Sequence, residues 1–265
     1  MAERNQSFDA LVLRTRDSPS GDRIVSLLCA EYGLVDAFVF GGPKSHLRSA
    51  SSPFIFGRAF IYADPVRNYR KLVDMSPIQG FPGLRDSYER LMAATTISEM
   101  ILKTSGCGGD FPEILGLALG CLMTLEGADS EGCETVLCAF LWRTLDLMGL
   151  KPDAASCANC GRSLDPEASG GLSYSRKALG FVCPACPEWE PSIDAAEARM
   201  LGILESAREG EMPRGGVKPG GGLSILIRSL AQDAAEGPVS SLAASWAIQP
   251  PYRAPPYQAP ADRAR

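Results

Sequence analysis

The chain has 265 residues, a formal net charge of −5 at pH 7 and a sequence pI near 5.1. Its 45% hydrophobic and 22% charged residues are typical of a globular protein, and the length allows one to three domains. The acidic balance argues against a protein coated throughout in nucleic acid. The start contains no apolar signal core and no apolar run reaches membrane-spanning length, so we expect a cytoplasmic protein.

The first 80 residues are predicted to form β-structure. Short runs rich in Val, Ile, Leu and Phe alternate with turn signals, and no long helical pattern separates them. Five such strands favour a small barrel of the OB type, with an SH3-like barrel as the alternative. We therefore predict an OB-fold nucleic-acid-binding domain over residues 1–80. The predicted strands are 8–14, 23–29, 34–40, 54–62 and 70–78.

A basic window lies inside this acidic chain. Residues 41–71 hold six cations and one acid, so the window carries +5 and the remainder −10. Cations gathered on one rim of a barrel would neutralise phosphates and give salt-sensitive, sequence-independent DNA binding. Each one alone could equally be a solvated surface charge. The candidate DNA-binding residues are Lys44, Arg48, Arg58, Arg67, Arg70 and Lys71, of which we expect Lys44 and Arg48 to project into solvent in or just after a Gly-Gly-Pro turn.

Aromatic residues are interleaved with these cations. Strand alternation should place some of the rings inside the barrel, where core packing explains them, and leave others free to stack on bases. The sequence does not separate the two groups. The rings are Phe38, Phe40, Phe54, Phe56, Phe60, Tyr62 and Tyr69.

Beyond residue 81 the apolar spacing becomes helical and predicts a helical domain over 81–150. Residues such as Leu84, Tyr88 and Leu91 mark a first helix that ends near 103. Asp110 is the expected N-cap of a second, strongly apolar helix, and Ser130 of a third that Gly149 ends.

Two Cys-x-x-Cys knuckles, separated by 22 residues, follow the third helix. Each can aim two thiolates at one point, so together they predict a closed, structural Zn²⁺ site in a ribbon spanning 151–190. A pair of disulfides or four buried thiols are the alternatives. The predicted ligands are Cys157, Cys160, Cys183 and Cys186. The scattered cysteines are expected to be core residues; these are Cys29, Cys107, Cys121, Cys133 and Cys138.

The last part of the chain, 191–249, is predicted to add helices that complete the helical domain. Ser192 can cap one helix through 207, and 225–235 and 239–248 are two further helical segments. A connector rich in glycine lies at 210–222. Residues 250–265 contain five prolines and are expected to be a disordered tail.

Catalysis is not expected. The only histidine, His46, is followed by Leu47 and Arg48, so the His-x-Glu element of a zinc deaminase is missing. A hydrolase triad that uses histidine is not expected either, because His46 lies in a basic turn. The main alternative to a DNA-binding protein is a zinc-ribbon adaptor that binds only protein.

The order of these features resembles the RecO family of DNA repair and recombination mediators. The similarity covers 11–186: LVLRTR at 11–16, GDRIVSLL at 21–28, EYGL at 31–34, VFGGPKS at 39–45, SPF at 52–54, FLWRTLDLMGLKP at 140–152, CANCG at 157–161 and GFVCPAC at 180–186. The resemblance implies an α+β multidomain protein with an N-terminal OB-fold β-barrel, an α-helical domain and a zinc ribbon with four cysteine ligands. It implies binding to single- and double-stranded DNA, annealing of complementary strands, and help in loading RecA onto strands coated by single-strand-binding protein. The implied partners are RecR and the C-terminal tail of single-strand-binding protein, with RecA involved indirectly, and the implied location is the nucleoid.

Overall fold

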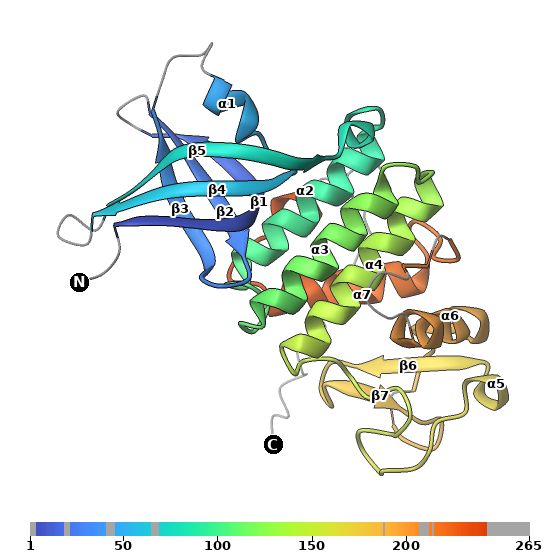
Figure 1. The fold of residues 1–265 in the computed structure, drawn as a ribbon. Coiled ribbons are helices and arrows are strands. Elements are labelled where there is room, and N and C mark those ends of the chain that lie inside the picture. Colours follow the sequence, from blue (N-terminus) through green and yellow to red (C-terminus); the bar gives the residue numbers. More distant parts are fainter. Residues whose placement is uncertain are drawn as a thin grey trace, which may run out of the picture.

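The computed structural model describes residues 4–18, 22–40, 46–64, 69–187, 189–206, 212–213 and 215–242. A β-barrel and a small three-stranded sheet lie at opposite ends of a helical bundle (Figure 1). Within the described ranges, no helix is long and apolar enough to cross a membrane. The predicted tail at 250–265 lies outside these ranges.

The barrel has five strands in the closed order β1-β2-β3-β5-β4. All neighbouring strands pair antiparallel except β3 and β5, which are parallel, and helix α1 (His46–Ala50) connects β3 to β4. This Greek-key closure is that of an OB fold, which confirms the OB barrel over the SH3-like alternative. The strands are β1 (Asn5–Asp17), β2 (Arg23–Cys29), β3 (Gly33–Val39), β4 (Ile55–Asp64) and β5 (Tyr69–Gly80).

Alternation along the strands fills the barrel interior. Val35, Ala37 and Val39 of β3 are buried inside, together with Leu72 and Met75 of β5. Because successive side chains point to opposite faces, the residues between those of β3 lie on the outer surface of the barrel. The residues of the barrel core and those of the outer surface are therefore two separate sets.

Three antiparallel helices form the centre of the bundle: α2 (Tyr88–Lys103), α3 (Phe111–Leu125) and α4 (Ser130–Leu147), with the short 3-10 helix η1 (Pro82–Arg85) before them. Asp110 caps α3 by accepting a hydrogen bond from the Glu113 N–H, as predicted. The cap predicted at Ser130 is wrong, because Asp129 accepts from the Gly132 N–H one residue earlier.

The stripe that marked α2 in the sequence is not its buried face. Tyr88 is 52% exposed and Leu91 is 36% exposed, while the smaller Ala93 and Ala94 face the core with Ile97. The helical spacing predicts the helix, but Tyr88 and Leu91, which mark it in the sequence, lie away from its buried side.

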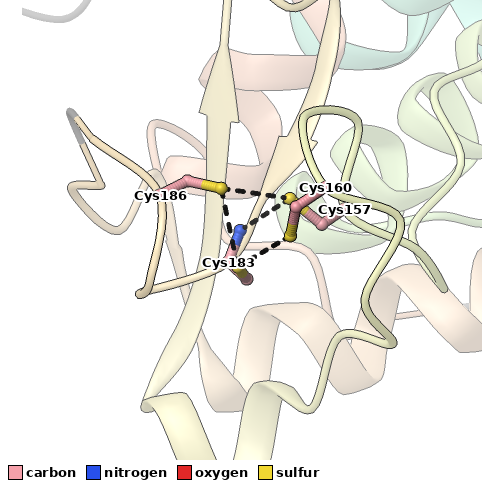
Figure 2. Close-up of side chains that lie close together, drawn as sticks. All are labelled: Cys157, Cys160, Cys183 and Cys186. Atoms are coloured by element: carbon pink, nitrogen blue, oxygen red, sulfur yellow. Dashed lines mark hydrogen bonds between the residues drawn. The ribbon is translucent and has the colours of Figure 1, made fainter.

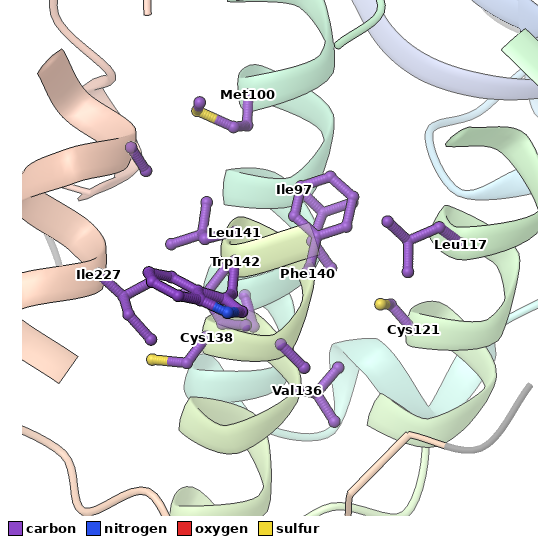
Figure 3. Packing of buried hydrophobic residues seen from close by; sticks show 14 of the residues in the cluster. Ile97, Met100, Leu117, Cys121, Val136, Cys138, Phe140, Leu141, Trp142 and Ile227 are labelled. Carbon is purple, nitrogen blue, oxygen red and sulfur yellow. The ribbon is translucent and has the colours of Figure 1, made fainter. Parts of the chain in front are cut away.

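The chain after the ribbon returns to the bundle. Helices α6 (Ala195–Ser206) and α7 (Gly222–Ala234) share one core with α2–α4, and Figure 3 shows Ile227 of α7 beside Trp142 and Cys138 of α4. The cap predicted at Ser192 is wrong, because Asp194 accepts from the Glu197 N–H. The predicted helix 239–248 is described only as far as Leu242.

The barrel is fixed to the bundle through a tight contact at the β2–β3 turn. Gly33 has φ of +68°, and a Cβ there would lie 2.4 Å from the ring of Phe111, the first residue of α3. Leu11, Leu13 and Leu28 on the outer face of β1 and β2 belong to the bundle core. The bundle thus covers one side of the barrel, and Leu34 is the one residue of β3 and β5 that packs against the bundle core. The β3–β5 seam lies outside that core, and helix α1 contacts β5.

Candidate metal site and candidate nucleic-acid interface

The first knuckle is a compact turn that sits on the small ribbon sheet. The ribbon pairs β6 (Gly171–Ser175) with β7 (Gly180–Val182) on one side and β8 (Ile193–Asp194) on the other; the four-residue helix α5 (Pro166–Ser169) precedes β6. Gly161 at φ +71° donates its N–H to the Cys157 carbonyl and closes the turn. The Ala158 N–H donates to Phe181 of β7, so the first knuckle is fixed beside the strand that leads into the second.

The structure brings the sulfurs of all four knuckle cysteines together (Figure 2). The Sγ atoms lie within 4.8 Å of one another, with 3.7 Å between Cys157 and Cys186, 3.6 Å between Cys160 and Cys183, and 3.8 Å between Cys183 and Cys186. A tetrahedron of thiolates about 2.3 Å from a zinc ion has edges of about 3.8 Å. A disulfide needs about 2.05 Å. The four cysteines are therefore free thiols arranged so that they could hold a metal ion.

Backbone N–H groups stabilise the thiolate form of Cys157. The Cys183 N–H lies 3.3 Å from the Cys157 Sγ. Desolvation raises the pKa of the Cys157 thiol, but N–H groups of Cys160, Cys183 and Asn159 outweigh it and lower the pKa to about 6. In the same cluster, desolvation and the neighbouring cysteines raise the pKa of Cys186 to about 12, so the first thiolate to form is that of Cys157. Metals bind thiolates, and a bound metal ion would favour deprotonation of the other sulfurs.

The remaining cysteines confirm the prediction that they are core residues. All five are buried, and burial raises the pKa of Cys107 and of Cys133 to about 11. Buried thiols with raised pKa values are unreactive. In the part of the chain that the structure describes, the knuckle sulfurs form the one cysteine cluster with metal-binding geometry.

Four of the six predicted cations lie within the described residues: Arg48, Arg58, Arg70 and Lys71. Lys44 and Arg67 lie outside the described residues. Arg58, on the outer face of β4, lies with its Nε 2.8 Å from Oδ1 of Asp9 on β1, so a carboxylate already compensates it. Arg70 is exposed near the start of β5, and Lys71 beside it places Nζ 5.3 Å from the centre of the Phe40 ring.

The position of Arg48 differs from the predicted one, in which its side chain projects into solvent. Arg48 does not project from a turn but lies in α1, where its side chain is half-buried. Its buried Nε has no hydrogen-bond partner among the described residues, and its backbone carbonyl accepts from Arg23. A half-buried arginine has less charge available to a phosphate than a solvent-facing one.

The rings separate into a packed group and an outer group. Phe54 is buried and Phe56 is half-buried, and both pack in the core shared with the bundle. Phe38, Phe40 and Tyr69 contact one another on the outside of the β3–β5 seam.

Sequence reasoning missed the acids that face the barrel cations. Besides Asp9, Asp36 of β3 accepts from Arg16 of β1 at 2.7 Å and from Ser26 of β2 at 2.6 Å. The signal was present in the strand alternation, since both acids occupy outward positions. Finding the pairs required the register across strands, which residue types alone do not supply.

An OB barrel, a helical bundle and a four-cysteine ribbon in one chain define an α+β multidomain protein with a candidate metal site. The family model "Recombination protein O N terminal" matches residues 1–81 and "Recombination protein O C terminal" matches 85–216. The chain belongs to the RecO family of DNA repair and recombination proteins.

Curated relatives span most of both chains. The DNA repair protein RecO of Pelotomaculum thermopropionicum is 30% identical over 203 residues, which are 75% of this chain and 75% of the relative. The protein of the same name from Desulfitobacterium hafniense is 28% identical over 215 residues, covering 78% and 74%. That from Bacillus pumilus is 26% identical over 217 residues, covering 80% and 81%.

Proposed function

We propose that this protein is a recombination mediator that binds single- and double-stranded DNA, anneals complementary strands and helps load RecA onto strands coated by single-strand-binding protein. The observation that carries the proposal is the OB barrel of a RecO-family chain whose β3–β5 seam lies outside the bundle core and carries Arg70 and Lys71. OB barrels commonly bind oligonucleotides on such outer faces.

Annealing needs no catalysis in this scheme. Two DNA strands repel each other, and cations that neutralise both backbones lower the barrier to pairing while the bases remain free to pair. We therefore propose a binding protein, not an enzyme, which anneals without nucleotide hydrolysis.

The decisive experiment measures annealing of complementary oligonucleotides precoated with single-strand-binding protein. The protein should accelerate duplex formation on coated strands without ATP. Equal rates with and without the protein, on both coated and bare strands, would overturn the proposal.

The metal that we propose for the four-cysteine cluster is Zn²⁺. Four thiolates with tetrahedral spacing match a structural zinc site, which leaves no open position for water. Cys157, Cys160, Cys183 and Cys186 would hold the ion, and its contribution would be to fix the ribbon. Zinc content of the purified chain, measured by elemental analysis, tests the identity of the metal.

The proposed partners are RecR, the C-terminal tail of single-strand-binding protein and, indirectly, RecA, and the proposed location is the nucleoid in the cytoplasm. Support for these partners comes from membership of the RecO family. Pull-down with purified RecR and with a tail peptide tests each separately.

An adaptor that binds only protein is the second candidate. Two observations favour it: Asp9 compensates Arg58, and Asp36 compensates Arg16, in a chain of net charge −5. Mobility shifts with single-stranded and duplex oligonucleotides over a salt titration separate the candidates. A mediator binds both and weakens as salt rises, whereas an adaptor binds neither.

A further inference from the structure

Three aromatic rings form a continuous contact on the outside of the barrel. The ring centres of Phe38 and Tyr69 are 5.4 Å apart with planes inclined by 23°, and those of Phe38 and Phe40 are 6.3 Å apart with planes inclined by 18°. Phe40 and Tyr69 close the triangle at 6.2 Å. We call Phe38, Phe40 and Tyr69 the seam triad, because they join β3 to the parallel strand β5.

The seam triad is not part of either hydrophobic core. Phe38 occupies an outward position between Ala37 and Val39, which fill the barrel interior with Val35, and Phe40 follows directly after the end of β3. None of the three rings belongs to the bundle core, and Phe40 remains 37% exposed. Three neighbouring rings on an outer surface are a feature that core packing does not explain.

Positively charged side chains lie beside the seam triad. This combination of rings and cations suits a polymer in which flat bases alternate with negatively charged phosphates. Lys71 places its Nζ 5.3 Å from the centre of the Phe40 ring, and Arg70 precedes it on an exposed position. The nearest outward acid on β3, Asp36, is already held by Arg16 and Ser26. Two further acids lie near Tyr69. Asp64 is opposite it in the β4–β5 register. Asp22 is close enough to help raise the pKa of Tyr69, after desolvation, which is the larger cause.

We propose that the seam triad is a stacking platform for unpaired nucleobases, with Lys71 and Arg70 contacting the adjoining phosphates. The inference rests on the proposed function, because it takes single-stranded DNA as the polymer. Bases inside a duplex are already stacked on their neighbours and cannot offer a free face, so the platform selects single strands. A base held by its face keeps its pairing edge open, which is what annealing needs.

Because stacking does not depend on counterion release, the preference for single strands over duplex should grow as salt rises. Phosphate contacts hold both forms and weaken together, while the stacking contribution remains. The platform thus divides binding into a salt-sensitive part common to both forms and a salt-resistant part specific to bases.

The test compares three probes of equal length: oligo-dT, an abasic phosphodiester strand and a blunt duplex. The full-length chain should bind oligo-dT about tenfold more tightly than the abasic strand, within the range measured for base–aromatic stacking. The F38A/F40A double variant should lose that preference and keep its affinity for the duplex. Phe40→Tyr, which retains a ring, should keep the preference.

Phe60→Ala is the matched control. Phe60 is 40% exposed on the outer face of β4, close to the exposure of Phe40, and makes no ring contact with another described residue. It should leave the preference for oligo-dT unchanged, and thermal melts establish that every variant is folded.

Equal affinity of the unmodified chain for oligo-dT and the abasic strand would overturn the platform while leaving the proposed function standing. The same conclusion follows if F38A/F40A retains the preference or if Phe60→Ala loses it. Failure of the unmodified chain to bind any of the three probes would overturn the proposed function together with the platform.

Discussion

Arg228 of α7 donates hydrogen bonds to both carboxylate oxygens of Glu134 of α4, with 2.8 Å between Nε and Oε1, and the two side chains are only 8% and 9% exposed. Ser224 of α7 donates to the same carboxylate. The two residues are 94 positions apart in sequence, and their pairing anchors α7 to the bundle.

Removing one member of this pair should destabilise the protein strongly. Arg228→Ala leaves Glu134 buried and uncompensated, so we expect a loss of about 3–5 kcal/mol in the free energy of unfolding, measured by urea denaturation. Arg176→Ala is the control, because Arg176 also pairs with a carboxylate of α7, Asp233, but is 71% exposed. That variant should lose less than about 1 kcal/mol. If both variants lost the same free energy of unfolding, burial would not be what makes the Arg228–Glu134 pair important for stability.

The same pair predicts a pH dependence. Burial raises the pKa of Glu134, but hydrogen bonds and charge from Arg228 outweigh it and hold the pKa below its ordinary value of 4.5. A depressed folded pKa means that the unfolded chain takes up the proton first as pH falls, so stability is present above about pH 4.5 and is lost below it. The free energy of unfolding of the unmodified protein should therefore fall more steeply below pH 4.5 than that of Glu134→Gln. Parallel pH profiles would show that Glu134 contributes no such linkage.

The four-cysteine cluster predicts how the ribbon responds to losing a ligand. Cys157→Ser or Cys183→Ser leaves three thiolates, so the content of the proposed zinc should fall from about one ion per chain to near none, with loss of stability. Elemental analysis measures the first effect and thermal unfolding the second. Cys133→Ala removes a buried thiol of α4 that lies outside the cluster and should leave the zinc content unchanged. Retention of a full equivalent of zinc by both serine variants would exclude these ligands.

How far the sequence predicts the structure depends on how local each signal is. The predicted strand 23–29 agrees with β2 at both ends, because a run rich in Val, Ile and Leu lies there between turn signals at 18–21 and 32–33. The knuckles were found because the spacing of two cysteines within one turn suffices to aim both sulfurs. Both features depend on residues adjacent in the chain.

The barrel surface could not be predicted in the same way. Arg58 and Asp9 are 49 residues apart, and only the β1–β4 register places them opposite each other. The seam triad depends likewise on the parallel pairing of Phe38 with Lys71. Composition located the basic window, but long-range register decides which cations and rings share a surface.

Exposure and register together predict which arginine contributes to the proposed DNA binding. Arg70 is exposed on β5, so Arg70→Gln should remove one phosphate contact, weaken duplex binding and lower the slope of log affinity against log salt by about 0.9. Arg58→Gln should change the slope much less, because Asp9 already compensates that charge. Fluorescence anisotropy with a labelled duplex over a salt series gives both slopes. If the two variants lower the slope equally, Arg58 exchanges Asp9 for a phosphate on binding, and the contact surface extends along β4 toward the middle of the strand.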